Sequence, residues 1–145
     1  MQMIPTTAKQ YGLDTTCGAT PIASIDAGTR HIIKLDQYWA KFISNKDERI
    51  KFVLASYNVG LGHIIDAKNL AKKYGKNPNL WFNNVERYIV LKSSPKYYND
   101  PIVRCGYCRG EEPYKYVREI IARYEHYKNT IKQKDEKSIL ADNIL

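Results

Sequence analysis

Apolar residues recur at helical spacing through most of this 145-residue chain, and this periodicity limits its fold more than any other feature. Ile50, Val53, Leu54 and Tyr57, for example, follow the i, i+3, i+4, i+7 pattern of an amphipathic helix. No segment shows convincing alternation with a period of two, which would indicate a half-buried strand. The sequence therefore predicts an all-α fold.

The same patterns divide the chain into helices and breaks. Predicted helices cover 24–44, 47–58, 63–74, 80–91 and 112–131, with a short one inside 1–12. Gly60 and Gly62 interrupt the pattern, and 93–110 is predicted to be irregular because it holds prolines and glycines. We expect one domain over 1–131 and a frayed helix or disordered tail over 132–145.

The chain is basic, with 23 Lys and Arg against 15 Asp and Glu, a net charge of +8. This charge favours an anionic partner, such as nucleic acid, anionic lipid or an acidic cell-wall polymer. The basic residues are spread along every predicted helix, which argues against a nucleic-acid module. No apolar run is long enough for a membrane span, and no signal-peptide pattern is present, so we expect no membrane insertion by this chain. Oligomeric state is not predicted.

The three cysteines are Cys17, Cys105 and Cys108, an odd number that predicts no disulfide framework. The last two form a C-x-x-C motif, which suits a redox pair or half of a zinc site. A redox motif is expected beside a βαβ unit, and a zinc site needs two further ligands, whereas the histidines are scattered. We interpret the thiols as incidental or locally bridged, keep redox or zinc chemistry as a remote alternative, and expect no metal and no cofactor.

Three segments have spacings that helical periodicity does not explain. They read MQMIPTTA at 1–8, LASYNVGLGH at 54–63 and GYCRGEEPYKYV at 106–117. In this order they resemble the G-L-M-Q-x-x-P-x-T-A, A-x-Y-N-x-G and E-x-x-x-Y-V motifs of the family 1 lytic transglycosylases. Each motif is weak alone, but three in order along an all-α chain are specific. The resemblance implies a goose-type-lysozyme-like catalytic domain.

Further matches resemble the membrane-anchored F-type branch most. They are G-Y-x-R-G-x-E at 106–112, H-x-x-D-A at 63–67 and P-K-Y-Y at 95–98. The resemblance covers about 1–128. It implies non-hydrolytic cleavage of the bond between N-acetylmuramic acid and N-acetylglucosamine in peptidoglycan, giving 1,6-anhydromuropeptides. It also implies action on peptidoglycan glycan strands in the cell envelope or periplasm, without a metal or a cofactor.

The family mechanism needs a glutamate that acts first as general acid and then as base. In the family this Glu opens an E-S motif that precedes G-L-M-Q, whereas Met1 already matches the Met of that motif. Glu112 matches the Glu of E-x-x-x-Y-V instead. We therefore expect an N-terminally truncated domain that lacks its acid and does not cleave peptidoglycan. The alternatives are a fragment of an active enzyme and a non-catalytic peptidoglycan-binding remnant.

The resemblance assigns substrate contacts to residues of all three motifs. The expected contacts are Met1, Gln2, Tyr57, Asn58 and Gly60, with Tyr107, Arg109 and Tyr114 as weaker candidates at the rim. Tyr116 is expected to point its hydroxyl toward the place of the acid, as a supporting residue. From periodicity alone, Tyr57 and Tyr116 would be core residues and Asn58 a helix-ending residue. We expect Asn58 and Tyr116 to share one cleft near Gln2.

Overall fold

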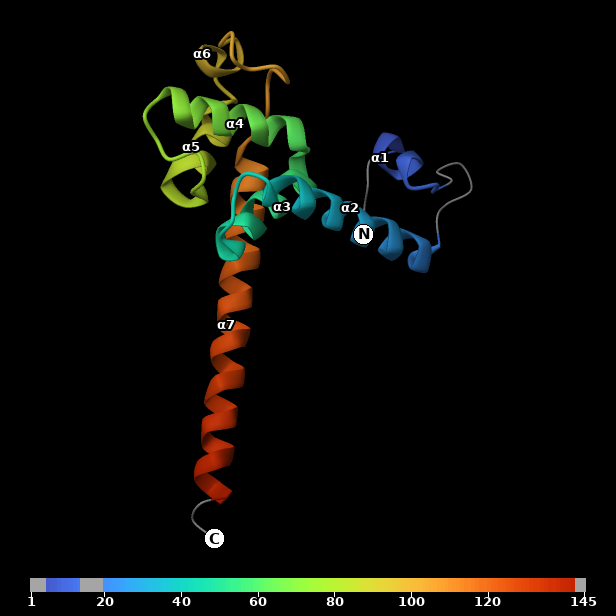
Figure 1. Ribbon diagram of the computed structural model, residues 1–145, viewed down its shortest axis with the longest axis vertical. Helices are drawn as coiled ribbons and strands as arrows, with labels where there is room; N and C mark the ends of the chain where they lie inside the picture. The colour runs from blue at the N-terminus through green and yellow to red at the C-terminus, as the bar shows by residue number, and fades with distance from the viewer. Residues whose placement is uncertain (1–4, 14–19, 143–145) are drawn as a thin grey trace.

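The computed structural model describes residues 5–13 and 20–142 of the chain, and these residues form helices and connecting turns with no strand (Figure 1). The all-α prediction is confirmed. The helices are α1 Pro5–Gln10, α2 Pro21–Ala40, α3 Lys46–Val59, α4 Leu61–Lys73, the π-helix η1 Trp81–Val85, α5 Glu86–Leu91, α6 Pro95–Tyr98 and α7 Glu111–Asp142.

The helix starts follow local capping chemistry. The hydroxyl of Thr20 accepts a hydrogen bond from Ala23 N at 3.2 Å, and Pro21 follows in the first turn of α2, where its missing N–H costs nothing. α2 therefore begins three residues before the predicted 24–44. The Asn45 side chain caps α3 in the same way, accepting from Glu48 N at 3.0 Å.

The predicted helix over 80–91 is wrong in its first half. The chain is kinked within η1, because Phe82 is extended and Asn83 has a left-handed φ of 60°. Asn tolerates this conformation better than most residues. The Glu86 carboxylate fixes the kink by accepting a hydrogen bond from Asn83 N at 2.8 Å.

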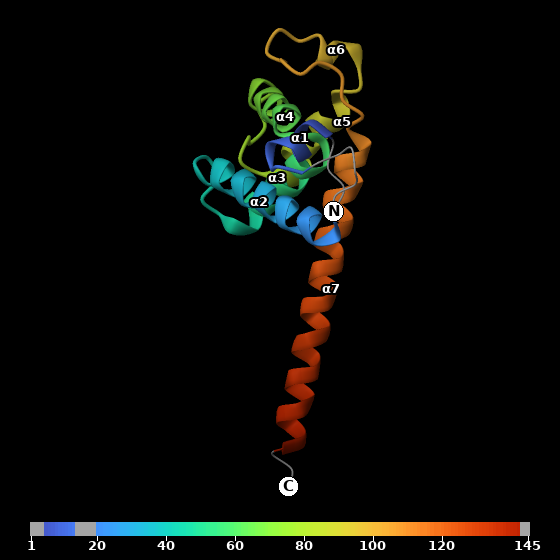
Figure 2. The ribbon, with the colours of Figure 1, turned by 90° about the vertical axis from the view of Figure 1, so that its right-hand side faces the viewer.

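Aromatic side chains build the centre of the core. Trp39 of α2, Phe52 of α3 and Trp81 of η1 lie in a row, with ring centroids 5.1 Å and 5.3 Å apart, the first pair tilted and the second edge-to-face. All three are almost completely buried, and Trp39 Nε1 donates to the Ser56 hydroxyl at 2.9 Å. α3 carries this row and packs against α2, α4 and α7, so it is the central helix of the domain (Figure 2).

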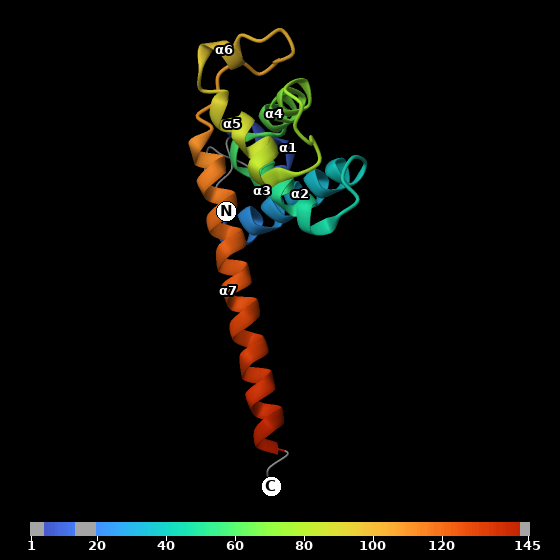
Figure 3. The same cartoon turned by 90° about the vertical axis from the view of Figure 1, so that its left-hand side faces the viewer.

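The helices form a compact body from which α7 projects. Figures 1 and 3 show the first turns of α7 beside α3 and α5, while its C-terminal half extends away from the other helices. Tyr127 and Ile131 on that half are exposed. None of the described helices has a stretch both long and apolar enough to cross a lipid bilayer.

Candidate functional site

Two predicted site residues from separate motifs lie on α3 and α7, helices that pack against each other. Tyr57 of α3 and Tyr116 of α7 are both partly buried and packed against the core. The Tyr57 hydroxyl is buried and has no hydrogen-bond partner in the described structure. Burial, and secondly the nearby Tyr116 phenol, raise the pKa of Tyr57. Tyr57 therefore offers a protonated hydroxyl that is free to donate or accept a hydrogen bond.

Tyr57 also contacts a histidine that the sequence did not single out. The rings of His31 and Tyr57 lie 5.7 Å apart, and the Tyr11 hydroxyl lies 3.0 Å from His31 Nδ1. Burial, and secondly Lys34, lower the pKa of His31, so its imidazole is neutral at neutral pH. We call Tyr11, His31, Tyr57 and Tyr116 the tyrosine–histidine cluster. No spacing in the sequence marks Tyr11 or His31, because their pairing depends on how α1 lies on α2.

The junction of α3 and α4 follows Tyr57 directly and contains the Asn58 side chain and the Gly60 backbone. Asn58 follows Tyr57 directly in the last turn of α3, and its side chain is exposed. Gly60 ends α3 with φ 97°, a conformation that L side chains rarely adopt, and nothing lies within 4 Å of the space a side chain would fill. The junction therefore presents an open stretch of backbone beside an exposed carboxamide.

The remaining predicted residues lie elsewhere. Tyr114 is two residues from Tyr116, about 200° around the helix, and its ring lies 4.8 Å from the Arg118 guanidinium on the other face of α7. Tyr107 is exposed and lies edge-on to Tyr98, and Arg109 is an exposed ion-pair partner of Glu112 at 3.3 Å. Met1 and Gln2 lie outside the described residues.

Five of the six glutamates with described side chains form ion pairs, and the sixth, Glu125, is exposed on α7. Glu48 pairs with Lys51, Glu86 with Arg118, Glu111 with Lys115, Glu112 with Arg109 and Glu119 with Arg123. No carboxylate of the described residues bonds to the Tyr57 hydroxyl. The cluster thus provides phenols and an imidazole, whereas the carboxyl group that a general acid requires is not found there in the described part of the chain.

The H-x-x-D-A segment has a structural role that the sequence did not reveal. Asp66 and Lys92 form a buried ion pair at 2.7 Å, with side chains 2% and 0% exposed. The Asp66 carboxylate also accepts hydrogen bonds from Arg104 N at 3.0 Å and Cys105 N at 2.9 Å, and Lys92 Nζ lies 3.0 Å from His63 Nδ1. This network ties the loop before α7 to α4.

The network also sets the charge states of its members. Burial raises the pKa of Asp66, but the hydrogen bonds from Lys92, Arg104 N and Cys105 N outweigh it and lower that pKa overall. Burial, and then Lys92, lower the pKa of His63 against a smaller opposing effect of Asp66. Asp66 is therefore ionised and His63 neutral, so the imidazole can accept a hydrogen bond from Lys92.

The C-x-x-C motif lies at the end of this loop. Cys105 is exposed, Cys108 is buried, and both thiols are free. Burial is the main cause that raises the pKa of each, which disfavours the thiolate that redox and zinc chemistry use. Within the described ranges, no group of three or more His, Cys, Asp or Glu side chains is arranged to hold a metal ion. Cys17 lies outside those ranges.

The helical fold, with one motif at the C-terminal end of α3 and another at the start of α7, is that of a lysozyme-like domain. Residues 1–80 match the family model described as the transglycosylase SLT domain. The chain belongs to this family, as its motifs predict.

Curated relatives of the chain carry the description membrane-bound lytic murein transglycosylase F. A protein of Haemophilus influenzae (strain PittGG) is 42% identical over 104 residues, which is 72% of this chain and 20% of the relative. Relatives from Yersinia enterocolitica and Vibrio campbellii are 39% and 36% identical, over 85% and 92% of this chain and 24% of each relative. The chain thus spans about a fifth to a quarter of the relatives it matches.

Proposed function

We propose that this chain binds the glycan strands of peptidoglycan as part of a lytic transglycosylase domain, through the surface around Tyr57, Asn58, Gly60 and Tyr116. The observation that carries the proposal is that Tyr57 and Tyr116 both pack against the core, from helices α3 and α7 that contact each other. These residues belong to two motifs far apart in the sequence. Membership of the transglycosylase SLT family and the names of the relatives support the same substrate.

The chemistry of this surface suits an N-acetylated sugar. Asn58 offers an exposed amide that can both donate to and accept from an N-acetyl group. Gly60 lets a sugar ring approach the backbone closely, because no side chain stands in the way. The Tyr57 hydroxyl lacks a partner, so a group from the substrate or from an acid would satisfy it. Met1 and Gln2 remain proposed contacts on the same surface.

The proposal separates binding from cleavage. Cleavage needs the glycosidic oxygen to be protonated as the bond breaks, and general acid catalysis contributes roughly 10²–10⁴-fold. A tyrosine hydroxyl is a poor substitute for a carboxylic acid in this role, so Tyr116 does not supply the missing acid. We propose that this chain by itself binds glycan without releasing 1,6-anhydro products, and that Tyr116 supports an acid from outside the described residues.

The same reasoning gives a proposed location. The relatives are named membrane-bound, and their named substrate, murein, lies in the cell envelope. The net charge of +8 suits a wall polymer whose peptides carry carboxylates. We propose that the protein acts in the cell envelope, on the periplasmic side.

Co-sedimentation with purified sacculi tests the binding proposal. Asn58→Ala should weaken binding about 2- to 10-fold, the range expected when one hydrogen bond of about 0.5–1.5 kcal/mol is lost. Asn99→Ala is the matched control, because Asn99 is also an exposed asparagine at the end of a helix but lies after α6. Equal losses for both variants, or none for Asn58→Ala, would contradict the proposed surface.

Mass spectrometry of the supernatant tests the cleavage proposal separately. Sacculi incubated with the chain should release no 1,6-anhydromuropeptides above a no-protein blank. Such products from the chain alone would show that it holds its own acid, and Glu111→Gln and Glu112→Gln would be the first variants to examine.

A further inference from the structure

One face of α7 carries an apolar seam that the rest of the described chain covers only in part. The residues of the seam follow the four-three spacing of a coiled coil: Pro113, Val117, Ile120, Tyr124, Tyr127 and Ile131. Pro113 and Val117 are almost completely buried, whereas Tyr124, Tyr127 and Ile131 are 58%, 64% and 59% exposed. The apolar seam therefore continues beyond the part that the domain buries.

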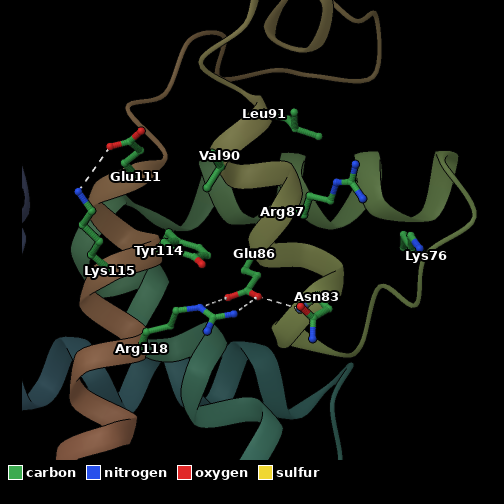
Figure 4. Close-up of a pocket in the computed structure, with 10 residues that line it drawn as sticks. All are labelled: Lys76, Asn83, Glu86, Arg87, Val90, Leu91, Glu111, Tyr114, Lys115 and Arg118. Atoms are coloured by element: carbon green, nitrogen blue, oxygen red, sulfur yellow. Dashed lines mark hydrogen bonds and ion pairs between the residues drawn. The ribbon is translucent and has the colours of Figure 1, made fainter.

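Contacts within the chain fix how α7 is turned about its own axis. Val117 packs in the core, where α7 contacts α3, and Figure 4 shows Arg118 bonded to Glu86 of α5 on another face of the helix. Arg118 donates to the Glu86 carboxylate from Nε at 3.1 Å and from Nη2 at 2.7 Å, and the Glu86 side chain is only 3% exposed. Held on both faces, α7 cannot rotate to bury the exposed end of the apolar seam in its own domain.

A groove borders the exposed end of the apolar seam. It has a volume of about 560 Å³ and lies between the first turns of α3 and the middle of α7. Ile50 and Leu54 of α3 and Ile121 of α7 give it apolar walls, and Tyr124 lines it from the seam. Apolar surface that continues from a groove along an exposed helix face is typical of a protein–protein contact. The partner should therefore be a protein with an apolar face of its own.

Charges of both signs are left unpaired around this groove. Its lining includes two cations and two carboxylates without an opposite charge within 4.0 Å among the described side chains: Lys46, Asp47, Glu125 and Lys128. A partner surface of a single sign would be repelled by half of these groups. A second copy of this chain carries both signs next to a matching apolar seam, so it can satisfy both features together.

The charges beside the apolar seam also indicate how two copies would pair. In a parallel pair of helices, Arg123 of one copy would face Lys128 of the other, and these like charges repel. In an antiparallel pair, residues on the same flank of the seam meet. Glu125 and Lys128 lie on one flank, because each residue advances about 100° around the helix. A two-fold axis between residues 126 and 127 then places Glu125 of each copy opposite Lys128 of the other.

We propose that two copies of this chain dimerise through the apolar seam, with their α7 helices antiparallel about this two-fold axis. Tyr124, Tyr127 and Ile131 of the two copies interdigitate across the axis, and the Glu125–Lys128 pair forms twice. The contact also supports the C-terminal half of α7, which projects from the domain, because a solitary helix of about this length is marginal in water.

Sedimentation velocity over a concentration series of about 10–500 µM tests the dimer. The three exposed side chains of each copy bury a few hundred Å², less than the roughly 800 Å² per partner of a stable complex. The dimer should therefore be weak, with a Kd of tens to hundreds of micromolar. The expected result is a reversible shift from the mass of one chain toward that of two. A monomer at every concentration, or species that grow beyond a dimer, would overturn the proposal.

Paired variants locate the contact. Tyr127→Lys with Ile131→Lys should weaken dimerisation at least about tenfold, because two apolar side chains lose their burial. Ile22→Lys with Ile25→Lys adds the same charge to α2, at side chains that are 82% and 55% exposed, and should change the affinity less than about twofold. Equal losses in the two pairs, or a larger loss from the α2 pair, would show that the apolar seam is not the interface.

Charge reversal tests the antiparallel arrangement. Glu125→Lys should weaken the dimer about 2- to 30-fold, the range expected for two exposed ion pairs. Adding Lys128→Glu to that variant exchanges the two charges and should restore the wild-type affinity. No loss in the single variant, or a loss that the double variant does not restore, would contradict the two-fold arrangement. Neither outcome bears on the glycan surface, which sacculus binding reports separately.

Discussion

The buried ion pair between Asp66 and Lys92 provides the sharpest test of how this fold is held together. Asp66→Asn keeps the size of the side chain and removes its charge, so Lys92 is left with an unpaired charge at 0% exposure. The single amide oxygen also cannot serve both Arg104 N and Cys105 N, which the two carboxylate oxygens accept now. The substitution therefore affects both the pair and the loop that it anchors.

The expected cost follows from burial. Removing one partner of a buried pair typically costs about 3–5 kcal/mol, because the other charge stays out of water. One unsatisfied backbone donor costs about 1–3 kcal/mol, part of the same loss. We therefore expect Asp66→Asn to lower the free energy of unfolding by about 3–5 kcal/mol, a large share of the roughly 5–15 kcal/mol that holds most domains.

Urea denaturation followed by the fluorescence of Trp39 and Trp81 measures this cost. The matched control is Asp26→Asn, which breaks an exposed i,i+4 pair with Arg30 whose side chains are 60% and 53% exposed. It should cost no more than about 0.5 kcal/mol. If Asp66→Asn stays within about 1 kcal/mol of the wild type, the network does not anchor the loop as described.

Acid titration adds a second check on the same carboxylate. The pKa of Asp66 is lowered in the folded chain from its ordinary 3.8. Its contribution to stability is therefore complete above about pH 4 and is lost as the pH falls through the lower folded pKa. Asp66→Asn should lack this contribution, so the difference between variant and wild type should shrink at low pH. A difference that stays constant down to pH 2 would contradict the lowered pKa.

Three further predictions concern other parts of the chain. Gly110→Ala should lower the free energy of unfolding by about 3 kcal/mol, because the new Cβ would lie 1.8 Å from Ile89 O. Gly75→Ala, at a glycine with φ 73° and open space around it, should lower it by only about 1–2 kcal/mol. Equal losses in urea unfolding would refute the close packing at Gly110. The pKa values of His31 and His63 are both lowered, so the unfolded chain binds more protons and stability should decrease as the pH falls below 6.5. His63→Gln should reduce that decrease, and an unchanged pH profile would argue against a neutral His63. The double variant Cys105→Ser with Cys108→Ser should keep its fold and its sacculus binding. Its free energy of unfolding should fall by about 1–3 kcal/mol, because a hydroxyl replaces the buried Cys108 thiol. Stoichiometric zinc in the wild type would overturn the interpretation that the thiols bind no metal.

The sequence predicted the helices where the signal is local. The apolar spacing of 47–58 predicted α3 to within one residue at each end, because helical periodicity shows in residues only three or four positions apart. The prediction failed at Asn83, where the kink depends on a carboxylate that is also held by Arg118, 32 residues farther on. Long-range partners of this kind leave no trace in local periodicity.

In the candidate site, too, residues within local motifs were predicted and residues joined by long-range contacts were not. Motif resemblance selected Tyr57 and Tyr116, and both side chains pack against the core. It also grouped Tyr114 with Tyr116, although two residues along a helix face nearly opposite directions. Tyr11 and His31 were missed because their hydrogen bond joins segments 20 residues apart that no motif covers. The sequence indicates Asp66 only as part of the H-x-x-D-A motif, since its burial and its three hydrogen-bond partners arise only on folding.

The most direct test of the central claim is two-dimensional NMR of the chain titrated with a soluble peptidoglycan glycan fragment. Chemical-shift changes are expected to gather at Tyr57, Asn58, Gly60 and Tyr116, with saturation at one common affinity. Changes confined to the projecting half of α7, around Tyr127 and Ile131, or no changes at all, would contradict a glycan-binding surface at the α3–α7 contact.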